Sequence, residues 1–398
     1  MDMVRLRAWW SDRQELNNRK PGQSPAETLS AVGWARSVGG VGPYLTLFSR
    51  SGTSVADIHC ALEKQEIHEL PCARGCTYIV PKEDFALALK VGQGFSDEAA
   101  MNTARKFLGV SDQEVEVLMD KVVEALADGP LEPKGLKEKV GDAARNLGDE
   151  GKKRGQTSTL PLALGFLQSR GRIRRIPTNG RLDQQRYSYA IWDPSPLAGC
   201  NLTKEEAYAR LAEKYFRWAG PASLGHFQWF SGLGVGASKA AIANLNLRTI
   251  EGSELLLPGD LVDEFENFQT PSKPNYRLVS CIDSHLLLRR DLPNLIEDED
   301  EKCQMVGEKG VQLVGGGLQD LSNHGILDRG RVVGVWEFDT EGGEIVWHSF
   351  VGKNEALLQA IEEMEKYIKS QLGDARSFSL DSPASRKPKI DALRRLTS

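Results

Sequence analysis

The chain has 398 residues, with 50 lysines and arginines against 55 aspartates and glutamates, and a formal net charge of −5. This balance excludes a protein covered in cations, so any nucleic-acid-binding surface must be a local patch. No apolar run is long enough to cross a bilayer, and the six cysteines are too few for a disulfide framework, so we expect a cytoplasmic protein with no membrane partner. No histidine and cysteine spacing matches a metal site, and we expect neither metal nor cofactor.

The N-terminal part of the chain is predicted to hold an arm and one domain. Residues 1–24 are polar and contain Pro21, which predicts a flexible arm. Residues 25–96 show three helical stretches, the third capped by Ser54, followed by two short alternating strands. Three helices and a hairpin are the order of a winged helix-turn-helix, so we predict the first such domain here.

The same order of elements returns twice more. In residues 97–197, periodic apolar residues predict three helices before a hairpin, at 115–126, 136–147 and 160–169. In residues 198–272, one helix ends at Gly220, Pro221 opens a second, and a third runs from about Ala237 to Leu245 before two short strands. We therefore predict second and third winged helices.

The C-terminal part has a different pattern. Residues 273–373 contain several strand-like segments with glycine-rich joints, then one amphipathic helix. We expect a small β-barrel or antiparallel sheet with a closing helix, followed by a disordered tail at 374–398. The predicted fold class is therefore α+β, with three tandem winged helix-turn-helix domains before this sheet.

The most informative segment is the hairpin after the helix at 160–169. Residues 160–192 carry six arginines and one acid, Asp183, a local charge of +5. The arginines are Arg170, Arg172, Arg174, Arg175, Arg181 and Arg186. A cationic hairpin beside a helix on an acidic protein is typical of a surface that binds the phosphate backbone. The alternative is an edge hairpin whose charge only keeps it soluble.

Further cations complete the predicted DNA-binding set. Three of them, Lys152, Lys153 and Arg154, precede the third helix of the second unit, where a phosphate contact is expected. Lys239 lies near the N-terminus of the third helix of the third unit, and a helix N-terminus attracts phosphate. Arg36 and Arg74, in the first unit, are the last two members.

Five motifs in order give the chain a resemblance to a known family. They centre on Pro43-Tyr44-Leu45, Arg74-Gly75, Gly171 to Trp192, Gly220-Pro221-Ala222-Ser223-Leu224, and Asp283 with Leu286 and Arg289. Together they resemble the bacterial winged-helix DNA glycosylases of the AlkZ-like group, over roughly residues 25–372. The resemblance implies tandem winged helices, a C-terminal barrel and removal of alkylated or crosslinked bases from DNA.

The resemblance also exposes a missing feature. In this family a Gln-x-Gln or Gln-x-Asp pair before the Pro-Tyr-Leu helix is taken to position the hydrolytic water. The corresponding residues here are Arg36 and Val38 or, in another register, Ala35 and Ser37, so neither register offers a glutamine or a carboxylate. Arginine cannot act as a base, because its pKa lies above about 12. We therefore interpret the usual pair as absent.

One carboxylate is a candidate for a displaced catalytic group. Asp283 is followed by Ser284 and His285, a run that suggests a triad. Neighbouring residues on a strand point to opposite faces, so Asp283 and His285 could share a side whereas Ser284 could not. The simpler interpretation is a turn entering the barrel. Asp283 nevertheless stays the catalytic candidate.

The sequence leaves three functions open. The first is a DNA-binding, repair-associated protein, nucleoid-associated in a bacterium, with double-stranded and damaged DNA as its partner. The second is an active glycosylase with a non-standard site, and the third is a winged-helix regulator acting through protein contacts. Oligomeric state is not predicted.

Overall fold

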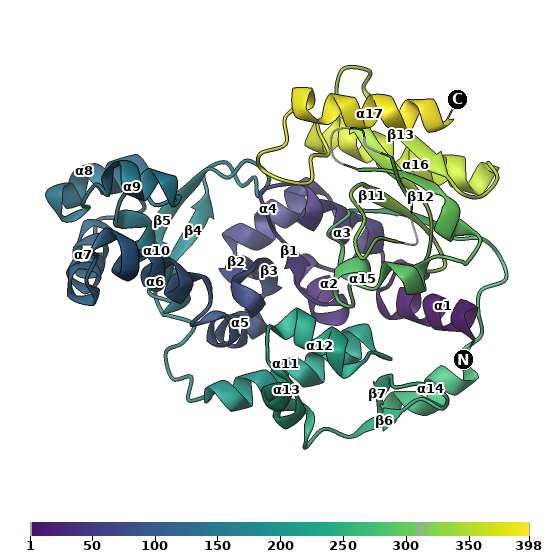
Figure 1. Ribbon diagram of the computed structural model, residues 1–398, viewed down its shortest axis with the longest axis horizontal. Coiled ribbons are helices and arrows are strands. Elements are labelled where there is room, and N and C mark those ends of the chain that lie inside the picture. Colours follow the sequence, from purple (N-terminus) through teal and green to yellow (C-terminus); the bar gives the residue numbers. More distant parts are fainter. Residues whose placement is uncertain (1, 308–309, 311, 315–316, 398) are drawn as a thin grey trace.

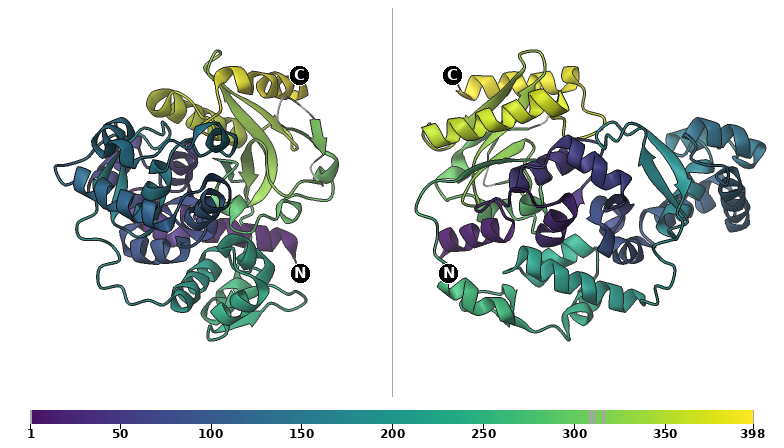
Figure 2. Two further views of the ribbon diagram at one scale, coloured as in Figure 1. Left: turned by 60° about the vertical axis from the view of Figure 1, so that its left-hand side comes forward. Right: turned by 180° about the vertical axis from the view of Figure 1, so that it is seen from behind.

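The computed structural model describes residues 2–307, 310, 312–314 and 317–397, which form a mixed α/β protein of several lobes (Figure 1). The first unit lies at the centre, between the lobe of α6–α10, the lobe of α11–α14 and the C-terminal sheet. Figure 2 shows the same arrangement from two further sides. No helix of the described ranges is long and apolar enough to cross a membrane.

The first unit combines helices with a three-stranded antiparallel sheet in the order β1-β3-β2. Its elements are α1 (Met3–Arg13), α2 (Pro25–Val32), β1 (Ala35–Arg36), α3 (Gly42–Ser51), α4 (Val55–Glu63), β2 (Ile67–Pro71), β3 (Thr77–Pro81) and α5 (Phe85–Gly92). Ser54 and Asp57 form a capping box at the start of α4, which fixes that helix where the sequence predicts it.

The second unit forms a lobe with its own hydrophobic core. It contains α6 (Ser96–Leu108), α7 (Asp112–Ala125), α8 (Pro133–Val140), α9 (Gly148–Lys153), α10 (Leu160–Ser169), β4 (Ile173–Pro177) and β5 (Tyr187–Ile191). The β4–β5 hairpin is paired from Ile173–Ile191 to Pro177–Tyr187. The hairpin extends from this lobe toward the first unit (Figure 1).

The third unit again places three helices before a short hairpin. Its elements are α11 (Lys204–Ala219), α12 (Leu224–Ser231), α13 (Val235–Ile242), β6 (Leu247–Thr249), β7 (Leu256–Pro258) and α14 (Val262–Asn267). Side chains of α11 and α12, among them Tyr215, Phe216 and Phe227, share a core with α5 and one face of the first sheet. The third unit is therefore packed on the first.

The C-terminal part is built on an open antiparallel sheet in the order β13-β12-β11-β8. Its elements are β8 (Tyr276–Val279), α15 (Ser284–Leu287), β9 (Gln304–Val306), β10 (Gln312–Val314), β11 (His324–Asp328), β12 (Arg331–Asp339), β13 (Glu344–Ser349), α16 (Glu355–Tyr367) and α17 (Pro383–Thr397). Strands β9 and β10 pair only with each other among the described residues. The small antiparallel sheet with its helix is as expected, but no pairing in the described residues closes it into a barrel.

Two terminal predictions are wrong. The expected flexible arm at 1–24 contains α1, and its Trp9 and Trp10 are 0% and 2% exposed. Each indole N–H donates a 2.9 Å hydrogen bond to a backbone carbonyl, at Gly220 and Pro221 respectively. Two tryptophans bury a large apolar area, which offsets the polar composition of this segment. Because the carbonyls lie about 210 residues away, the sequence gives no local sign of them.

The expected disordered tail at 374–398 is also ordered over its described residues. Helix α17 packs on the C-terminal sheet and buries Ile390 and Leu393, which are 4% and 0% exposed. Before it, the segment at 374–381, here called the C-terminal strap, runs along the first unit and donates a hydrogen bond from Ser379 N to Val38 O. The amino-acid composition of the tail is polar, because only a few of its side chains are apolar and buried.

Candidate functional site

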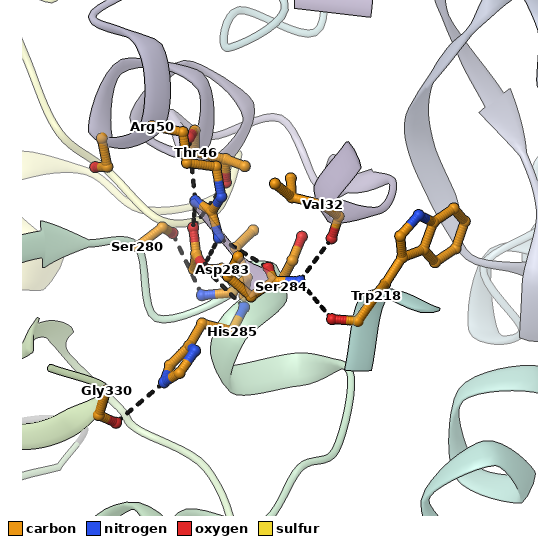
Figure 3. Close-up of polar contacts among 12 residues, drawn as sticks. Val32, Thr46, Arg50, Trp218, Ser280, Asp283, Ser284, His285 and Gly330 are labelled. Atoms are coloured by element: carbon orange, nitrogen blue, oxygen red, sulfur yellow. Dashed lines mark hydrogen bonds and ion pairs between the residues drawn. The ribbon is translucent and has the colours of Figure 1, made fainter. Parts of the chain in front are cut away.

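Asp283, the carboxylate singled out in the sequence, lies at the centre of a buried network (Figure 3). The Arg50 guanidinium donates to both its oxygens, at 2.8 and 2.7 Å, and both side chains are fully buried. Thr46 Oγ1 donates at 3.1 Å and the His285 amide at 2.8 Å. Burial alone would raise the pKa of Asp283, but Arg50 and these hydrogen bonds hold it below its usual value.

The network around Asp283 joins distant parts of the chain. Arg50 Nη2 also donates to Gln14 Oε1 at 3.0 Å. Gln14 in turn donates to the carbonyls of Val32 and Trp218, at 2.8 and 3.0 Å. Because α1, α2, α3, α11 and α15 are all tied to this network, we interpret Asp283 as a structural residue, while a catalytic role for it stays a prediction.

The neighbours of Asp283 do not form a triad either. His285 and Ser284 lie on the short helix α15 and not on a strand. His285 is fully buried, its Nε2 lies 3.0 Å from Gly330 O, and burial lowers its pKa to about 3. Ser284 Oγ donates to Trp34 O at 3.4 Å. The imidazole therefore stays neutral within the fold at physiological pH.

A second buried carboxylate, Glu69 on β2, has a different environment. The register Ala35–Ile79–Glu69 places Glu69 and Ser37 on the same face of the first sheet, since side chains alternate along a strand. Ser37 Oγ donates to Glu69 Oε1 at 2.5 Å. These residues are 2% and 5% exposed. A hydroxyl hydrogen-bonded to a carboxylate is a unit that can relay a proton.

The β4–β5 hairpin covers Glu69 from the second unit. Arg175 Nη2 lies 2.8 Å from Glu69 Oε2 and keeps 21% of its side chain exposed. The Arg175 guanidinium stacks over the Tyr187 ring at 4.6 Å. Burial, and next the negative charge of Glu69, raise the pKa of Tyr187. Arg175 is thus an internal ion-pair partner and not a free cation for DNA.

The tip of the hairpin rests on the loop that follows β1. Gly39 has φ +75°, and a Cβ there would overlap the side chain of Gln185. Gln185 itself has φ +50°, which is uncommon for a residue other than glycine. We define the junction site as Ser37, Glu69, Arg175, Gln185 and Tyr187, of which only Gln185 is exposed.

The C-terminal strap closes the same loop from the other side. Val41 N donates to Arg376 O at 2.9 Å, and a Cβ at Gly40 would overlap the carbonyl of Ser377. The Arg376 guanidinium donates to the carbonyl of Asp183 in the hairpin tip. The loop at 38–41 is therefore held between the second hairpin and the strap.

Several predicted DNA-binding cations are engaged in ion pairs. Arg170 lies 2.9 Å from Glu116 and Arg172 lies 3.5 Å from Asp120, both on α7. Arg181 pairs with Asp183 at 2.5 Å and donates to the carbonyls of Gln371 and Leu372. Arg181 thereby fastens the hairpin tip to the turn at Ile368–Leu372, which follows α16, so the hairpin does not protrude as a free ribbon.

The basic cluster before α10 also pairs locally. Lys152 lies 3.4 Å from Asp149, and Lys153 and Arg154 lie 3.6 and 2.7 Å from Glu150. These are exposed pairs within one helix and its end, and such pairs contribute little to stability. Their charges can still reach a phosphate, but they are balanced in the free protein.

Other predicted cations have no acidic partner among the described residues. Arg36 lies over the Tyr78 ring at 5.3 Å, and Arg74 lies over the Trp229 ring at 4.1 Å. The remaining three are Arg174, which is partly exposed, and Arg186 and Lys239, which are exposed. Burial lowers the pKa of Arg174, as expected for a guanidinium that lacks a nearby carboxylate.

The sequence did not single out Glu69 or Gln185. Glu69 belongs to the strand predicted at 67–70, but alternation alone does not tell which face is buried. The surplus of arginine in the hairpin was the available signal, because a carboxylate partner offsets the cost of burying a guanidinium. In the described residues, no group of three or more histidines, cysteines or acids could hold a metal ion.

Comparisons with known proteins agree on one family. The family model described as DNA glycosylase AlkZ-like matches residues 41–366. A solved structure, the Streptomyces sahachiroi DNA glycosylase AlkZ, is similar with a TM-score of 0.68 and 17% identity, over 95% of this chain and 98% of that chain. At this identity the likeness shows a shared fold. No curated protein sequence matches the chain significantly.

Proposed function

The chain belongs to the AlkZ-like family of DNA glycosylases, and from this membership we propose that it binds double-stranded DNA in the repair of damaged bases. Its place of action would be the cytoplasm, where the DNA of a bacterium lies. The single observation that supports the proposal most strongly is the family match over residues 41–366. The sequence motifs led to the same family.

We propose further that three units of the fold are winged helices. Each has helices followed by a two-stranded hairpin: β2–β3, β4–β5 and β6–β7. In such domains a helix enters the major groove and the wing contacts the backbone. By this proposal α4, α10 and α13 are the recognition helices.

The contacts with phosphate are proposed to come from the cations without a carboxylate partner. Arg174 and Arg186 belong to the second hairpin, and Lys239 lies on α13. A phosphate that approaches such a side chain does not have to displace an internal anion, so each contact retains its full electrostatic contribution. Arg36 and Arg74 are further members, because their planar guanidinium groups stack on aromatic rings with donor groups still available.

A binding titration tests this function. The wild-type protein should shift the fluorescence polarisation of a labelled 20-base-pair duplex at low salt, with affinity falling steeply as salt rises. A duplex carrying one N7-methylguanine should bind at least as tightly as its unmodified counterpart. If neither duplex binds at low salt, the protein is not a DNA-binding member of its family and a role in protein contacts becomes the better account.

A further inference from the structure

We propose that a cavity between the C-terminal strap, α17 and β12 binds a neutral oxopurine, a purine with a carbonyl oxygen beside a ring N–H, as the free base or the nucleoside. The cavity has a volume of about 670 Å³, which is usual for a small-molecule site in a protein. Its lining includes Glu337 on β12, Phe378 in the strap and Lys389 on α17. This inference goes beyond the proposed function and does not depend on DNA binding.

A buried carboxylate in the cavity wall has one oxygen to offer a ligand. Glu337 is 1% exposed, and its Oε1 accepts a hydrogen bond from Asn323 Nδ2 at 2.9 Å and lies 2.5 Å from Lys389 Nζ. Among the described residues, none donates a hydrogen bond to Oε2. A buried carboxylate oxygen without a donor is unfavourable, so an N–H group of a ligand that reaches Oε2 stabilises the site.

A hydrogen-bond donor stands beside this acceptor. Lys389 Nζ donates to Ser322 O and faces Glu337, and an ammonium group has three N–H donors, so one is left for a ligand. The wall therefore presents an acceptor and a donor side by side. In an oxopurine the ring N–H matches the carboxylate and the adjoining carbonyl oxygen matches the ammonium group.

The charges in the lining favour a ligand without net charge. Two acidic side chains, Glu337 and Asp381, and two basic ones, Arg386 and Lys389, line the cavity. Arg386 is already paired with Asp374 at 2.6 Å, as Lys389 is with Glu337. A charged ligand of either sign would meet a like charge in the same wall, which is costly where water is scarce. A neutral ligand with a polar edge avoids this repulsion.

Apolar side chains at the opening of the cavity suit a flat ring. Phe378 and Leu380 line the cavity and are 45% and 92% exposed. Phe378 N donates to Asp381 Oδ2 at 2.9 Å, which fixes the turn that carries both residues. Bases stack on exposed aromatic rings in many nucleic-acid-binding proteins. A purine whose polar edge meets Glu337 and Lys389 would have Phe378 available for its face.

Isothermal titration calorimetry of the full chain with inosine and 1-methylinosine tests the assignment. The two ligands differ only in the methyl group that replaces the N1 hydrogen, so only inosine can donate to Glu337. Inosine should bind with a dissociation constant on the order of 100 µM, as expected for a ligand of its size. The affinity for 1-methylinosine should be at least about 10-fold lower, because a hydrogen bond to a charged group is lost.

A third ligand distinguishes the free base from the nucleoside. Hypoxanthine is the base of inosine without its sugar. Equal affinity for the two supports a site for the free base, and an affinity for inosine that is at least about 10-fold higher supports a site for the nucleoside. If the wild-type protein binds neither, or binds inosine and 1-methylinosine equally, the proposal is overturned.

Two phenylalanines with equal exposure locate the site. Phe378→Ala should lower the affinity for inosine about 5-fold or more, because a stacking ring is lost. Phe107→Ala is the matched control, since Phe107 is also 45% exposed but lies on α6 in the second unit, and it should leave the affinity unchanged. Equal effects in the two variants would place inosine elsewhere and overturn the proposal.

The carboxylate itself is tested by Glu337→Gln, which should abolish the preference for inosine over 1-methylinosine. Persistence of the preference in a folded Glu337→Gln protein contradicts the role given to Oε2. This variant leaves Lys389 without its counter-ion, so its melting temperature is measured alongside, and if it does not fold the comparison of the two phenylalanine variants decides. Absence of duplex binding bears on the proposed function alone.

Discussion

Two carboxylates in this protein are buried against arginines, and their surroundings differ. Asp283 and Arg50 are both fully buried, and the carboxylate accepts hydrogen bonds from Arg50, Thr46 and the His285 amide. Glu69 accepts one from Ser37 and faces Arg175, whose side chain is 21% exposed. The fully buried pair joins helices from distant parts of the chain. The partly exposed pair lies where two units meet.

Burial of a carboxylate therefore does not by itself identify a catalytic group. A charge enclosed by hydrogen-bond donors on all sides has no room for a water or a substrate. Glu69 instead takes its partners from two units, the Ser37 hydroxyl from the first and the Arg175 guanidinium from the second. The difference lies in the number and origin of the partners.

The largest expected effect is on the Asp283 pair. Asp283→Asn leaves Arg50 buried without a counter-ion and should lower the free energy of unfolding by about 3–5 kcal/mol. Chemical denaturation measures this loss. The matched control is Asp320→Asn, which breaks the exposed ion pair with Arg290 at 2.7 Å and should cost at most about 1 kcal/mol. Equal losses in the two variants would contradict a structural role for Asp283.

The same pair predicts a dependence of stability on pH. Since the folded-state pKa of Asp283 is lowered, its contribution is present above the ordinary aspartate value of about 3.9 and is lost as the pH falls through the folded value. Unfolding free energies of the wild type and Asp283→Asn should therefore converge in acid. Parallel curves down to the lowest pH at which the protein folds would contradict this assignment.

A smaller loss of stability is expected at the junction site. Glu69→Gln removes the charge opposite Arg175, but water can reach that guanidinium, so the free energy of unfolding should fall by about 2 kcal/mol, less than for Asp283→Asn. The two variants are compared by denaturation under one set of conditions. A larger loss at Glu69 than at Asp283 would reverse the distinction drawn between the pairs.

Two glycines with similar backbone conformations differ in what surrounds them. Gly39→Ala and Gly52→Ala impose similar backbone strain, since φ is +75° and +71°, and each should cost about 1 kcal/mol. Only at Gly39 does the new Cβ overlap Gln185, whereas nothing lies within 4 Å at Gly52. Because Gln185 directly precedes Arg186, duplex affinity should therefore fall in the first variant and stay at the wild-type value in the second. Equal affinities in the two variants would show that Gly39 does not support the hairpin tip.

The sequence predicted local features well and long-range partners poorly. The capping box at Ser54 and the end of α11 at Gly220 are set by neighbouring residues, so their patterns can be read directly. The next helix, predicted to open at Pro221, begins at Leu224 after the cap residue Ser223. The role of Asp283 is decided by Arg50, which is 233 positions away. Helix α1 reads as a loose segment because the carbonyls that pair with its tryptophans lie in the third unit.

The arginine hairpin shows what the sequence could predict and what it could not. Its excess of charge predicted a DNA-binding surface, but charge counts do not tell which arginines have internal partners. Arg175 is paired with Glu69 of another unit, and Arg170 and Arg172 are paired with residues of α7. These pairings leave Arg174 and Arg186 as the hairpin cations with no acidic partner in the described residues.

The most direct test of the account is the salt dependence of DNA affinity in two matched double variants. Replacing Arg174 and Arg186 together by alanine should lower the slope of log K against log salt by about 1.8, because each phosphate contact contributes about 0.9. Replacing Arg170 and Arg172, which face acids on α7, should lower it by less than about half as much. An equal or larger change in the second variant would contradict the claim that the cations without internal partners bind the DNA backbone.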